Sequence, residues 1–272
     1  MLSIVIPSYK DPLLQRTIDD ILEHARGEIE IIVVIDGYSL EKPLKEDPRV
    51  SVLKFEENQG MRAAINFGVA ASKGEYIMKC DEHCAFDEGF DVKLLSKIED
   101  NWIVTPRRYK LDTEKWQVID EPAIDYERLV TNRPDKITGV YWTNRAIQRK
   151  DVLIDETMVF QGSCWVMSRK HWNFLGGLQE EGYGSFAQEA IELSLKTWLS
   201  GGKVMVNKTT WYAHKHRKFG RTYRTNSSAI EAGNKYSIDF WLNNRWKARV
   251  HDLEWLMKRF GLSFRKYDNN SL

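Results

Sequence analysis

The 272-residue sequence predicts an α/β fold in which helices flank a mainly parallel sheet. In the first hundred residues, short apolar runs alternate with amphipathic stretches, which is typical of repeated strand–helix units. Acidic residues follow two of the expected strands, at the sheet edge where open α/β sheets bind ligands. Hydrophobic residues make up 42% of the chain, which is enough for a packed core and excludes a disordered protein.

The N-terminal part is expected to contain four strands and two helices. The strands are the apolar runs at residues 2–7, 29–35, 50–55 and 76–79. The helices are expected from Asp11 to about residue 26 and over residues 61–72. Asp36 follows the second strand and Asp81 follows the fourth, so both carboxylates are expected at the same edge of the sheet.

The middle of the chain is less regular. Periodicity is lost between residues 107 and 156, and we interpret this segment as a long excursion and not as a second domain. Order then returns with strands at 158–167, 203–206 and 209–214 and helices at 169–175 and 188–199. Glycine pairs at 176–177 and 201–202 are expected to end these two helices.

A stripe of apolar residues marks the C-terminal segment. Its members are spaced by four, three, four and three residues: Trp246, Val250, Leu253, Met257 and Phe260. This spacing predicts a helix, from about residue 234, that packs on the body and leaves its basic residues in solvent. We therefore expect one large domain at residues 1–232 and a basic helical extension at residues 233–272.

The formal net charge of +1 hides an uneven distribution of charge along the chain. Residues 201–272 contain 15 Lys and Arg against 5 Asp and Glu, a balance of +10, whereas residues 1–200 contain 25 against 34, a balance of −9. The basic part could dock on the acidic body. It could equally bind an anionic partner such as a sugar nucleotide, a membrane surface or a nucleic acid.

The sequence contains no run of 18 apolar residues, and its first residues do not have the pattern of a secretory signal. Its three cysteines are odd in number and match no CxxC spacing, so no disulfide framework is expected. We therefore expect a protein without a stable membrane span, located in the cytoplasm, or in the host cytoplasm if the protein is viral.

The most informative cluster is DEHC at residues 81–84, directly after a strand. Alternate residues of an extended segment face the same way, so Asp81 and His83 can reach one cation while Glu82 faces elsewhere. A carboxylate with an imidazole suits Mn²⁺ or a similar divalent ion, which would neutralise a diphosphate. An isolated DxH motif is more often only a polar loop, but His214, at the end of a distant strand, fits the same site.

Two further acidic residues are candidates, each with a structural alternative. Asp36 is positioned to accept hydrogen bonds from a base or a ribose, or it is simply a turn residue before Gly37. Glu189 follows a glycine-containing loop at a helix start, where a carboxylate also stabilises the helix. His214 alone would more often be structural than a metal ligand.

The order of short motifs resembles that of GT-A glycosyltransferases of the family 2 type. The similarity is closer to the catalytic domain of polypeptide N-acetylgalactosaminyltransferases, and it covers nearly the whole chain. The motifs are SIVIPSY at 3–9, VIDG at 34–37, NQGMRAA at 58–64, DEHC at 81–84, FQGSC at 160–164, EAIELS at 189–194 and AHKHR at 213–217. The resemblance implies a Rossmann-like GT-A fold with a mixed sheet and a nucleotide-sugar donor.

The resemblance also implies roles for individual residues. The implied ligands of Mn²⁺, or Mg²⁺, are Asp81, His83 and His214. The implied donor contacts are Asp36 to uracil or another base, Arg62 and Tyr9 near the nucleotide, Arg217 to the diphosphate, and Glu189 to the transferred sugar. The family's Trp-Gly-Gly-Glu-Asn is replaced by FAQEA at 186–190, so the sugar is not implied. With neither a lectin domain nor a membrane anchor in the sequence, a mucin acceptor is not expected.

The expected reaction is transfer of a sugar, from a UDP-sugar in the first instance, to a hydroxyl group. The metal and Arg217 would stabilise the charge that develops on the leaving diphosphate. If the anomeric configuration is retained, a diphosphate oxygen takes the acceptor proton. If it is inverted, Glu189 is the leading candidate for the general base.

For the acceptor, the sequence slightly favours hydroxymethylated pyrimidine in DNA, as in phage-type DNA modification. The basis is the basic polar stretch 215–224 together with a basic tail, in which Arg245, Lys247 and Arg249 lie beside Trp241, Trp246 and Trp255. We also expect residues 215–228 to form a mobile cover over the bound donor. The alternatives are a cell-surface polysaccharide or glycolipid, with the tail on an anionic membrane, and a non-catalytic module that binds nucleotides or nucleic acid.

Overall fold

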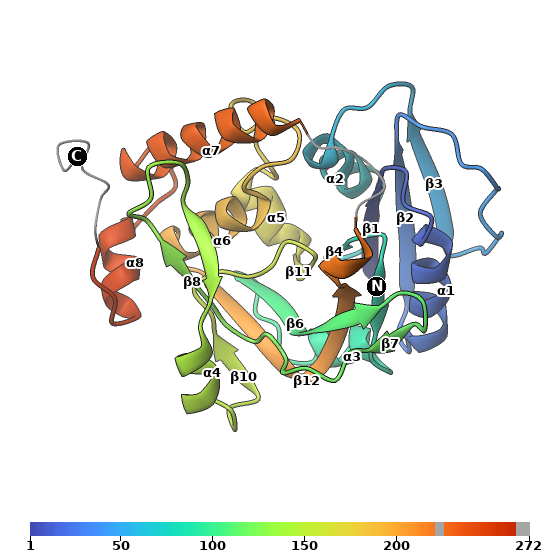
Figure 1. The fold of residues 1–272 in the computed structure, drawn as a ribbon, viewed down its shortest axis with the longest axis horizontal. Helices are drawn as coiled ribbons and strands as arrows, with labels where there is room; N and C mark the ends of the chain where they lie inside the picture. The colour runs from blue at the N-terminus through green and yellow to red at the C-terminus, as the bar shows by residue number, and fades with distance from the viewer. Residues whose placement is uncertain (221–225, 265–272) are drawn as a thin grey trace.

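The computed structural model describes residues 1–220 and 226–264. Within them, a mixed sheet of 10 strands runs through the molecule beside a second sheet of 2 strands (Figure 1). The strands are β1 (Leu2–Ser8), β2 (Ile29–Asp36), β3 (Val50–Phe55), β4 (Tyr76–Cys80), β5 (Cys84–Phe86), β6 (Trp102–Asp112), β7 (Gln117–Val118), β8 (Glu127–Val130), β9 (Thr138–Tyr141), β10 (Ile154–Glu156), β11 (Cys164–Ser168) and β12 (Lys203–Lys215). The helices are α1 (Leu14–His24), α2 (Met61–Ala71), α3 (Phe90–Leu95), α4 (Thr143–Gln148), α5 (Arg169–Leu175), α6 (Glu189–Leu199), the 3₁₀-helix η1 (Arg217–Phe219), α7 (Ser227–Leu242) and α8 (Leu253–Arg259). The expected α/β fold with a mixed, helix-flanked sheet is confirmed.

The strand order is β10-β12-β6-β11-β4-β1-β2-β3, so the first strands of the chain form one side of the sheet. β4, β1, β2 and β3 are parallel to their neighbours within this group. All four strands and both helices predicted for this half are present, with α1 shorter than expected at both ends. The carboxyl ends of β1, β2 and β4 therefore meet at one edge, where the acidic residues were expected.

Side chains of the central strands alternate between two hydrophobic layers. Val5 packs in the cluster that contains Ile65 of α2, whereas its neighbour Ile4 packs in the cluster that contains Ile18 of α1. The two helices thus cover opposite faces of the sheet. Gly68 allows α2 to lie close to β1, because a Cβ atom there would be 2.5 Å from a methyl group of Val5.

The segment 107–156 is more regular than the sequence predicted. β6 continues to Asp112 and crosses the sheet, and β8, β9, α4 and β10 follow it. β6 shows no apolar period because its second half carries charged side chains, two of which are neutralised by neighbours: Arg107 donates two hydrogen bonds of 2.8 Å to Asp125, and Lys110 pairs with Glu121. The interpretation as an excursion holds only for the loops between these elements.

The strand expected at residues 158–167 is shorter than predicted. β11 begins at Cys164, and the buried residues before it belong to the core without continuing the ladder. Val159 makes only an isolated bridge with Glu127. An apolar run alone did not distinguish core loop from strand.

The two closing strands expected at 203–206 and 209–214 form a single strand, β12. Its pairing with β6 is irregular, since Asn207 lies opposite Pro106 but Trp211 lies opposite the next residue, Arg107. Residues 208–210 are therefore extra on β12. Beyond them the parallel pairing resumes, with His214 opposite Lys110.

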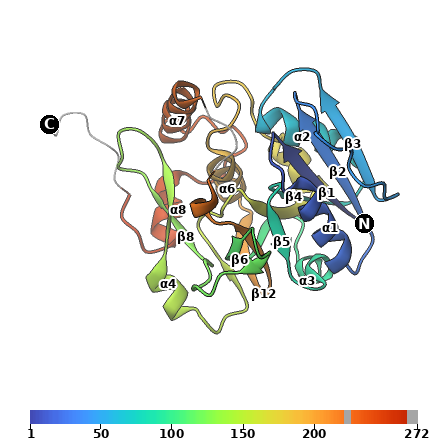
Figure 2. The same cartoon turned by 45° about the vertical axis from the view of Figure 1, so that its right-hand side comes forward.

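The single C-terminal helix predicted from about residue 234 is wrong. α7 ends at Leu242, and α8 starts only at Leu253, where the side chain of Asp252 caps the new helix by accepting a hydrogen bond from the Trp255 amide. Val250, predicted to be part of the packed stripe, is 69% exposed. Both helices lie on the opposite side of the molecule from β3 and α1 (Figures 1 and 2). The division at residue 232 falls inside α7 and stays a prediction.

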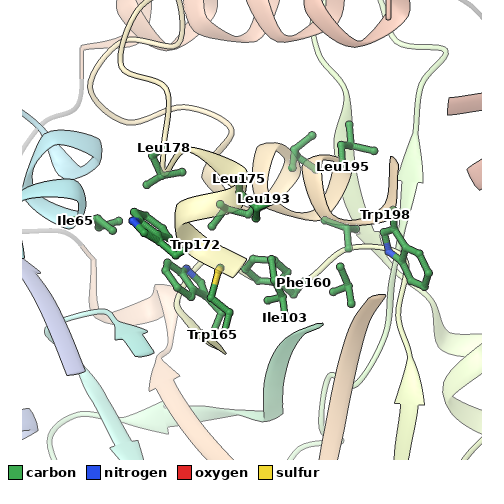
Figure 3. Packing of buried hydrophobic residues seen from close by; sticks show 14 of the residues in the cluster. Ile65, Ile103, Phe160, Trp165, Trp172, Leu175, Leu178, Leu193, Leu195 and Trp198 are labelled. Carbon is green, nitrogen blue, oxygen red and sulfur yellow. The ribbon is translucent and has the colours of Figure 1, made fainter. Parts of the chain in front are cut away.

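The larger hydrophobic cluster lies between the sheet and the helices α5 and α6 (Figure 3). Trp165 of β11 stacks on Trp172 of α5, with 5.6 Å between the ring centroids. Leu193 and Trp198 of α6 are buried in the same cluster. This packing fixes the position of α6, whose first residue is Glu189.

Among the described residues, no helix is long and apolar enough to cross a membrane. Cys80, Cys84 and Cys164 are all buried and free, which agrees with the expected lack of a disulfide framework. The cytoplasmic location stays a prediction.

Candidate functional site

A cleft of about 1020 Å³ opens at the carboxyl ends of β1, β2 and β4. It is lined by residues from both halves of the sheet and from the start of α6. All but one of the eight predicted site residues line it: Tyr9, Asp36, Asp81, His83, Glu189, His214 and Arg217. The exception is Arg62.

Asp81, His83 and His214 form a compact group of potential metal ligands. Their ligand atoms lie within 4.8 Å of one another. Nε2 of His214 is 3.0 Å from Nε2 of His83 and 3.1 Å from Oδ2 of Asp81. The group forms because β12 pairs with β5, with His214 opposite Cys84, which brings it beside the DEHC segment. Two imidazole nitrogens and one carboxylate oxygen suit a divalent ion such as Mn²⁺.

The charges of this group are set by its surroundings. Burial would raise the pKa of Asp81, but the ammonium group of Lys79 and the His214 ring outweigh it and hold this pKa well below its usual value. Burial lowers the pKa of His214 to about 4. His214 is therefore neutral at pH 7, which is the form that binds metals.

Lys79 is a site residue that the sequence analysis missed. Its side chain is 1% exposed. The ammonium donates to Oδ1 of Asp81 at 2.6 Å and to the Gly162 carbonyl at 2.6 Å, and lies 3.3 Å from Oε2 of Glu189. The signal in the sequence was a lysine within an otherwise apolar strand, since a buried lysine requires acidic partners.

Asp11, expected only to open the first helix, also reaches the ligand group. Its Oδ2 lies 3.1 Å from Nδ1 of His83 and accepts a hydrogen bond of 3.3 Å from Lys215. Its Oδ1 accepts from the Leu13 amide at 2.9 Å. The contact between Asp11 and Nδ1 of His83 orients the ring so that Nε2 faces His214. A carboxylate commonly supports a metal-binding histidine in this way. No motif in the sequence indicated it.

Asp36 has the structural role that the sequence offered as its alternative, and its contact with a base or ribose stays a prediction. It ends β2 before Gly37, whose φ of 68° fits a tight turn. Its carboxylate accepts hydrogen bonds from the amides of Gln59 at 2.6 Å and Gly60 at 2.9 Å and from the side chain of Asn58 at 2.7 Å. Burial raises its pKa despite these hydrogen bonds. Asp36 thus holds the loop before α2 at the cleft.

Glu189 is the first residue of α6, as the structural alternative required. Its carboxylate, however, is bound by other side chains: Oε1 accepts a hydrogen bond of 2.7 Å from the Trp165 indole, and Oε2 faces Lys79. The side chain is 5% exposed, and burial raises its pKa. Glu189 therefore lines the cleft as part of a buried network that ends at Asp81.

The expectation that Arg62 contacts the donor requires correction. Its guanidinium is fully buried and pairs with Glu192, while Nε donates to the Ala187 carbonyl at 3.0 Å and Nη1 to that of Gln179 at 2.9 Å. It also lies 4.3 Å from the Tyr183 ring. A buried guanidinium needs partners for its donors, and here the protein supplies them. Arg62 supports the loop before α6 from behind the cleft.

The remaining predicted residues lie at the rim. The Tyr9 ring meets the Tyr38 ring edge-on at 6.1 Å, and its amide donates to the buried carboxylate of Glu82. Glu82 also lines the cleft, where burial raises its pKa to about 8, so it does not simply face elsewhere. Arg217 is exposed at the start of η1. Residues 221–225 of the expected cover lie outside the described residues.

Comparison with known proteins gives a consistent result. The model of the family "Glycosyl transferase family 2" matches residues 3–171. Polypeptide N-acetylgalactosaminyltransferase 12 of Mus musculus is 23% identical over 236 residues, covering 78% of this chain and 39% of that protein. Polypeptide N-acetylgalactosaminyltransferase 10 of Rattus norvegicus is 26% identical over 238 residues, covering 80% and 38%. The chain thus spans less than half the length of these relatives, and the resemblance seen in the motifs is confirmed.

Solved structures share the fold. The crystal structure of GalNAc-T7 with UDP, GalNAc and Mn²⁺ has a TM-score of 0.76 and 18% identity, covering 97% of this chain and 55% of that one. A mannosyltransferase from Pyrobaculum calidifontis in complex with GDP-Man and Mn²⁺ has a TM-score of 0.55 and 14% identity, covering 90% and 71%.

Proposed function

Because this chain belongs to glycosyl transferase family 2, we propose that it transfers a sugar from a nucleotide diphosphate donor to a hydroxyl group with the help of a divalent metal ion. The observation that carries the proposal is the meeting of Asp81, His83 and His214 in the cleft, although His214 is 131 residues from His83 in the chain. A site for nucleotide binding alone would not require the buried Glu189 beside these ligands.

Asp81, His83 and His214 would hold Mn²⁺ or Mg²⁺, and the bound ion would supply positive charge to the diphosphate as the glycosidic bond breaks. Lys79 occupies Oδ1 of Asp81, which leaves Oδ2 beside the histidines. Arg217 is exposed at the rim of the same cleft and would donate hydrogen bonds to the diphosphate. These contacts accelerate the reaction because they strengthen as charge develops.

The donor nucleotide would lie toward β1 and β2, where Tyr9 and Asp36 line the cleft. Uridine is the base we propose, since GalNAc-T7 was solved with UDP, although the mannosyltransferase was solved with GDP-Man. Glu189 would contact the transferred sugar. Its two oxygens already accept hydrogen bonds from Trp165 and Lys79, which supports a fixed, charged contact and makes it a less mobile general base.

For the acceptor we propose hydroxymethylated pyrimidine in DNA first and a polysaccharide or glycolipid second. Arg245, Lys247 and Arg249 are exposed, which supports phosphate contacts. They lie next to the segment whose Val250 amide bonds to Leu199, at the end of α6 opposite to Glu189. DNA would thus have to extend along the length of α6, about 15 Å, to meet both regions.

The three tryptophans of the tail do not serve as stacking platforms for bases. Trp241 is 1% exposed, the Trp246 indole donates to Ser200, and Trp255 stacks on His251 with 3.6 Å between centroids. Binding to DNA would therefore depend on charge, without the aromatic contribution expected from the sequence.

The proposed function is tested by donor hydrolysis. The protein is incubated with a panel of sugar nucleotides and Mn²⁺, and release of free nucleotide is measured by chromatography. A glycosyltransferase releases nucleotide slowly from its own donor, and chelation stops the release. Tight nucleotide binding without release from any donor would instead indicate the non-catalytic module.

A further inference from the structure

Arg108 is a cleft residue for which the proposed reaction has no use. It lies on β6, separated from β4 by β11, and therefore on the opposite side of Asp81 from β1 and β2 in the sheet. In the parallel pairing of β6 with β12, Arg108 is opposite Tyr212 and Lys110 is opposite His214. Residues two apart in a strand share a face, so Arg108 and His214 belong to the same side of the sheet.

The guanidinium of Arg108 lacks partners that its neighbours have. Its Nε and Nη1 are buried and have no hydrogen-bond partner within the described part of the chain. On the same strand, Arg107 is paired with Asp125 and Lys110 with Glu121. Arg108 is the exception among the described charges of this strand, although it lies deeper than Arg107.

The carboxylate in this part of the cleft is already bound by another side chain. Glu127 also lines the cleft and is 4% exposed, but it is bound by the side chain of Gln161 and forms no ion pair with Arg108 in the described residues. Gly139 of β9 packs against it, since a Cβ atom there would be 2.7 Å from Oε2 of Glu127. Tyr141 of β9 lines the same part of the cleft. This part of the cleft thus holds guanidinium donors without hydrogen-bond partners among the described residues.

Burying guanidinium donors without partners is unfavourable, and a native protein retains such groups where a ligand satisfies them. The fixed donor geometry of arginine matches carboxylate and phosphate groups. We propose that Arg108 binds an anionic group, a carboxylate or a phosphate, on the acceptor substrate. This inference rests on the proposed function only in naming the bound molecule as the acceptor. The anion site itself rests on Arg108.

Position argues for the acceptor and against the donor. The proposed base contacts, Tyr9 and Asp36, follow β1 and β2, and the metal ligand Asp81 follows β4. The surroundings of Arg108 are Glu127, Tyr141 and Gln161, which all come from the other half of the sheet or its excursion. A donor that extends from Asp36 to Asp81 leaves this end of the cleft to the second substrate.

The test measures binding, so it does not depend on turnover. Protein saturated with UDP and Mn²⁺ is titrated with glucuronic acid, glucose 6-phosphate and glucose, and binding is followed by ligand-observed NMR. We expect at least one of the two anionic sugars to bind about tenfold or more tightly than glucose. Arg108→Gln should remove this preference and Arg108→Lys should retain part of it. Lys110→Gln, which removes an already paired charge from the same strand, should retain the full preference.

Preference for the phosphate alone or the carboxylate alone identifies the anion and supports the site. Equal binding of all three sugars by the wild-type protein would overturn the proposal, even if Arg108→Gln fails to fold. Loss of UDP affinity in Arg108→Gln would assign the guanidinium to the donor and also overturn it. Failure of the proposed function would show up separately, as nucleotide binding with no release from any sugar nucleotide.

Discussion

Lys79 and Glu189 meet in the interior although 110 residues separate them, with 3.3 Å between the ammonium and the carboxylate. The same ammonium is 2.6 Å from Asp81. One buried cation therefore joins the metal ligand to the residue proposed to contact the sugar. A change in any one of the three should be felt by the other two.

Removing Lys79 should destabilise the protein. Lys79→Met leaves two buried carboxylates without their cation, which costs roughly 3–5 kcal/mol of unfolding free energy. Urea unfolding measures this loss. The double variant Lys79→Met with Glu189→Gln lacks one of the two unpaired buried carboxylates. We therefore expect its loss of unfolding free energy to be smaller than the sum of the losses in the two single variants. Strict additivity would mean that the pair is not coupled.

Metal binding should depend on Asp81. Asp81→Asn removes the only carboxylate of the described ligand group, and we expect Mn²⁺ affinity, measured by electron paramagnetic resonance, to fall by about tenfold or more. Donor turnover should stop on chelation and return with Mn²⁺. Asp135→Asn, which changes an exposed carboxylate paired with Arg133, is the matched control and should bind Mn²⁺ normally. Full activity after exhaustive chelation would refute the metal assignment.

Glu189→Gln should affect turnover more than nucleotide affinity. The substitution keeps the shape and the hydrogen bond from Trp165 but removes the charge beside the proposed sugar position. We expect kcat to fall at least about tenfold, which corresponds to about 1.4 kcal/mol of barrier, with UDP affinity unchanged. Glu181→Gln, at an exposed position in the preceding loop, should leave both unchanged. Normal turnover in Glu189→Gln would reduce Glu189 to a helix-start residue.

Stability should fall in acid because of His171. This side chain lies 3.0 Å from the Thr197 hydroxyl, and burial lowers its pKa to about 4. The unfolded chain therefore binds the proton more tightly than the folded one. The contribution is fully present above the unfolded pKa of about 6.5 and is lost as the pH falls toward about 4, to a total of about 3 kcal/mol.

The measurement for His171 is urea unfolding at about pH 7.5 and about pH 4.5, in the wild type and in His171→Gln. Carboxylates titrate in both proteins, so the difference between them isolates the histidine. We expect a smaller loss of stability in the variant. An equal loss in both proteins would show that His171 is protonated without penalty in the folded state.

Binding to DNA should weaken steeply with salt if the basic tail contacts phosphates. With about four contacts, affinity for duplex should fall on the order of a hundredfold between about 50 and 200 mM salt. Substituting Arg245, Lys247 and Arg249 by Gln should flatten this dependence and leave donor hydrolysis intact. Gln at Lys42, Lys45 and Arg49, also exposed, is the matched control.

Three other outcomes would redirect the acceptor proposal. Reduced thermal stability of the triple variant, with weak and salt-insensitive DNA binding, would indicate that the tail docks on the acidic body. Binding to anionic vesicles but not to DNA would favour a membrane surface. No measurable binding to DNA at about 50 mM salt would favour a polysaccharide or lipid-linked acceptor.

The sequence predicted best those parts in which one physical rule dominates. The strands around Val5 and Val34 are apolar because both of their faces are buried, and they form where expected. β6 was missed because its second half carries charged residues, such as Arg107, which is neutralised by Asp125 further along the chain, and pairing of this kind leaves no periodic pattern. The C-terminal stripe had helical spacing, but Asn244, with a φ of 53°, interrupts the helix.

In the site, ligand types were predictable and their supports were not. Asp81, His83 and His214 have the side chains that a divalent ion requires, so the motif and the chemistry agree. Lys79 and Asp11 were hidden by their local roles, as a strand residue and a helix opener. For Arg62 the prediction was wrong in the other direction. Its place in a motif suggested a contact with the donor, which its burial excludes.

The three extra residues of β12 determine the position of His214, because they have no partners on β6. If residues 208–210 paired with β6 one by one, the ladder would continue unbroken from Asn207, and Trp211 would stand opposite Lys110 in place of His214. The histidine would be carried about 10 Å further along the strand, away from Asp81. Because three is odd, the shift would also reverse which side chains face the cleft. Deletion of residues 208–210 would keep His214 opposite Lys110, whereas pairing of these residues with β6 would dismantle the ligand group, so the site depends on this irregularity for as long as the three residues are present.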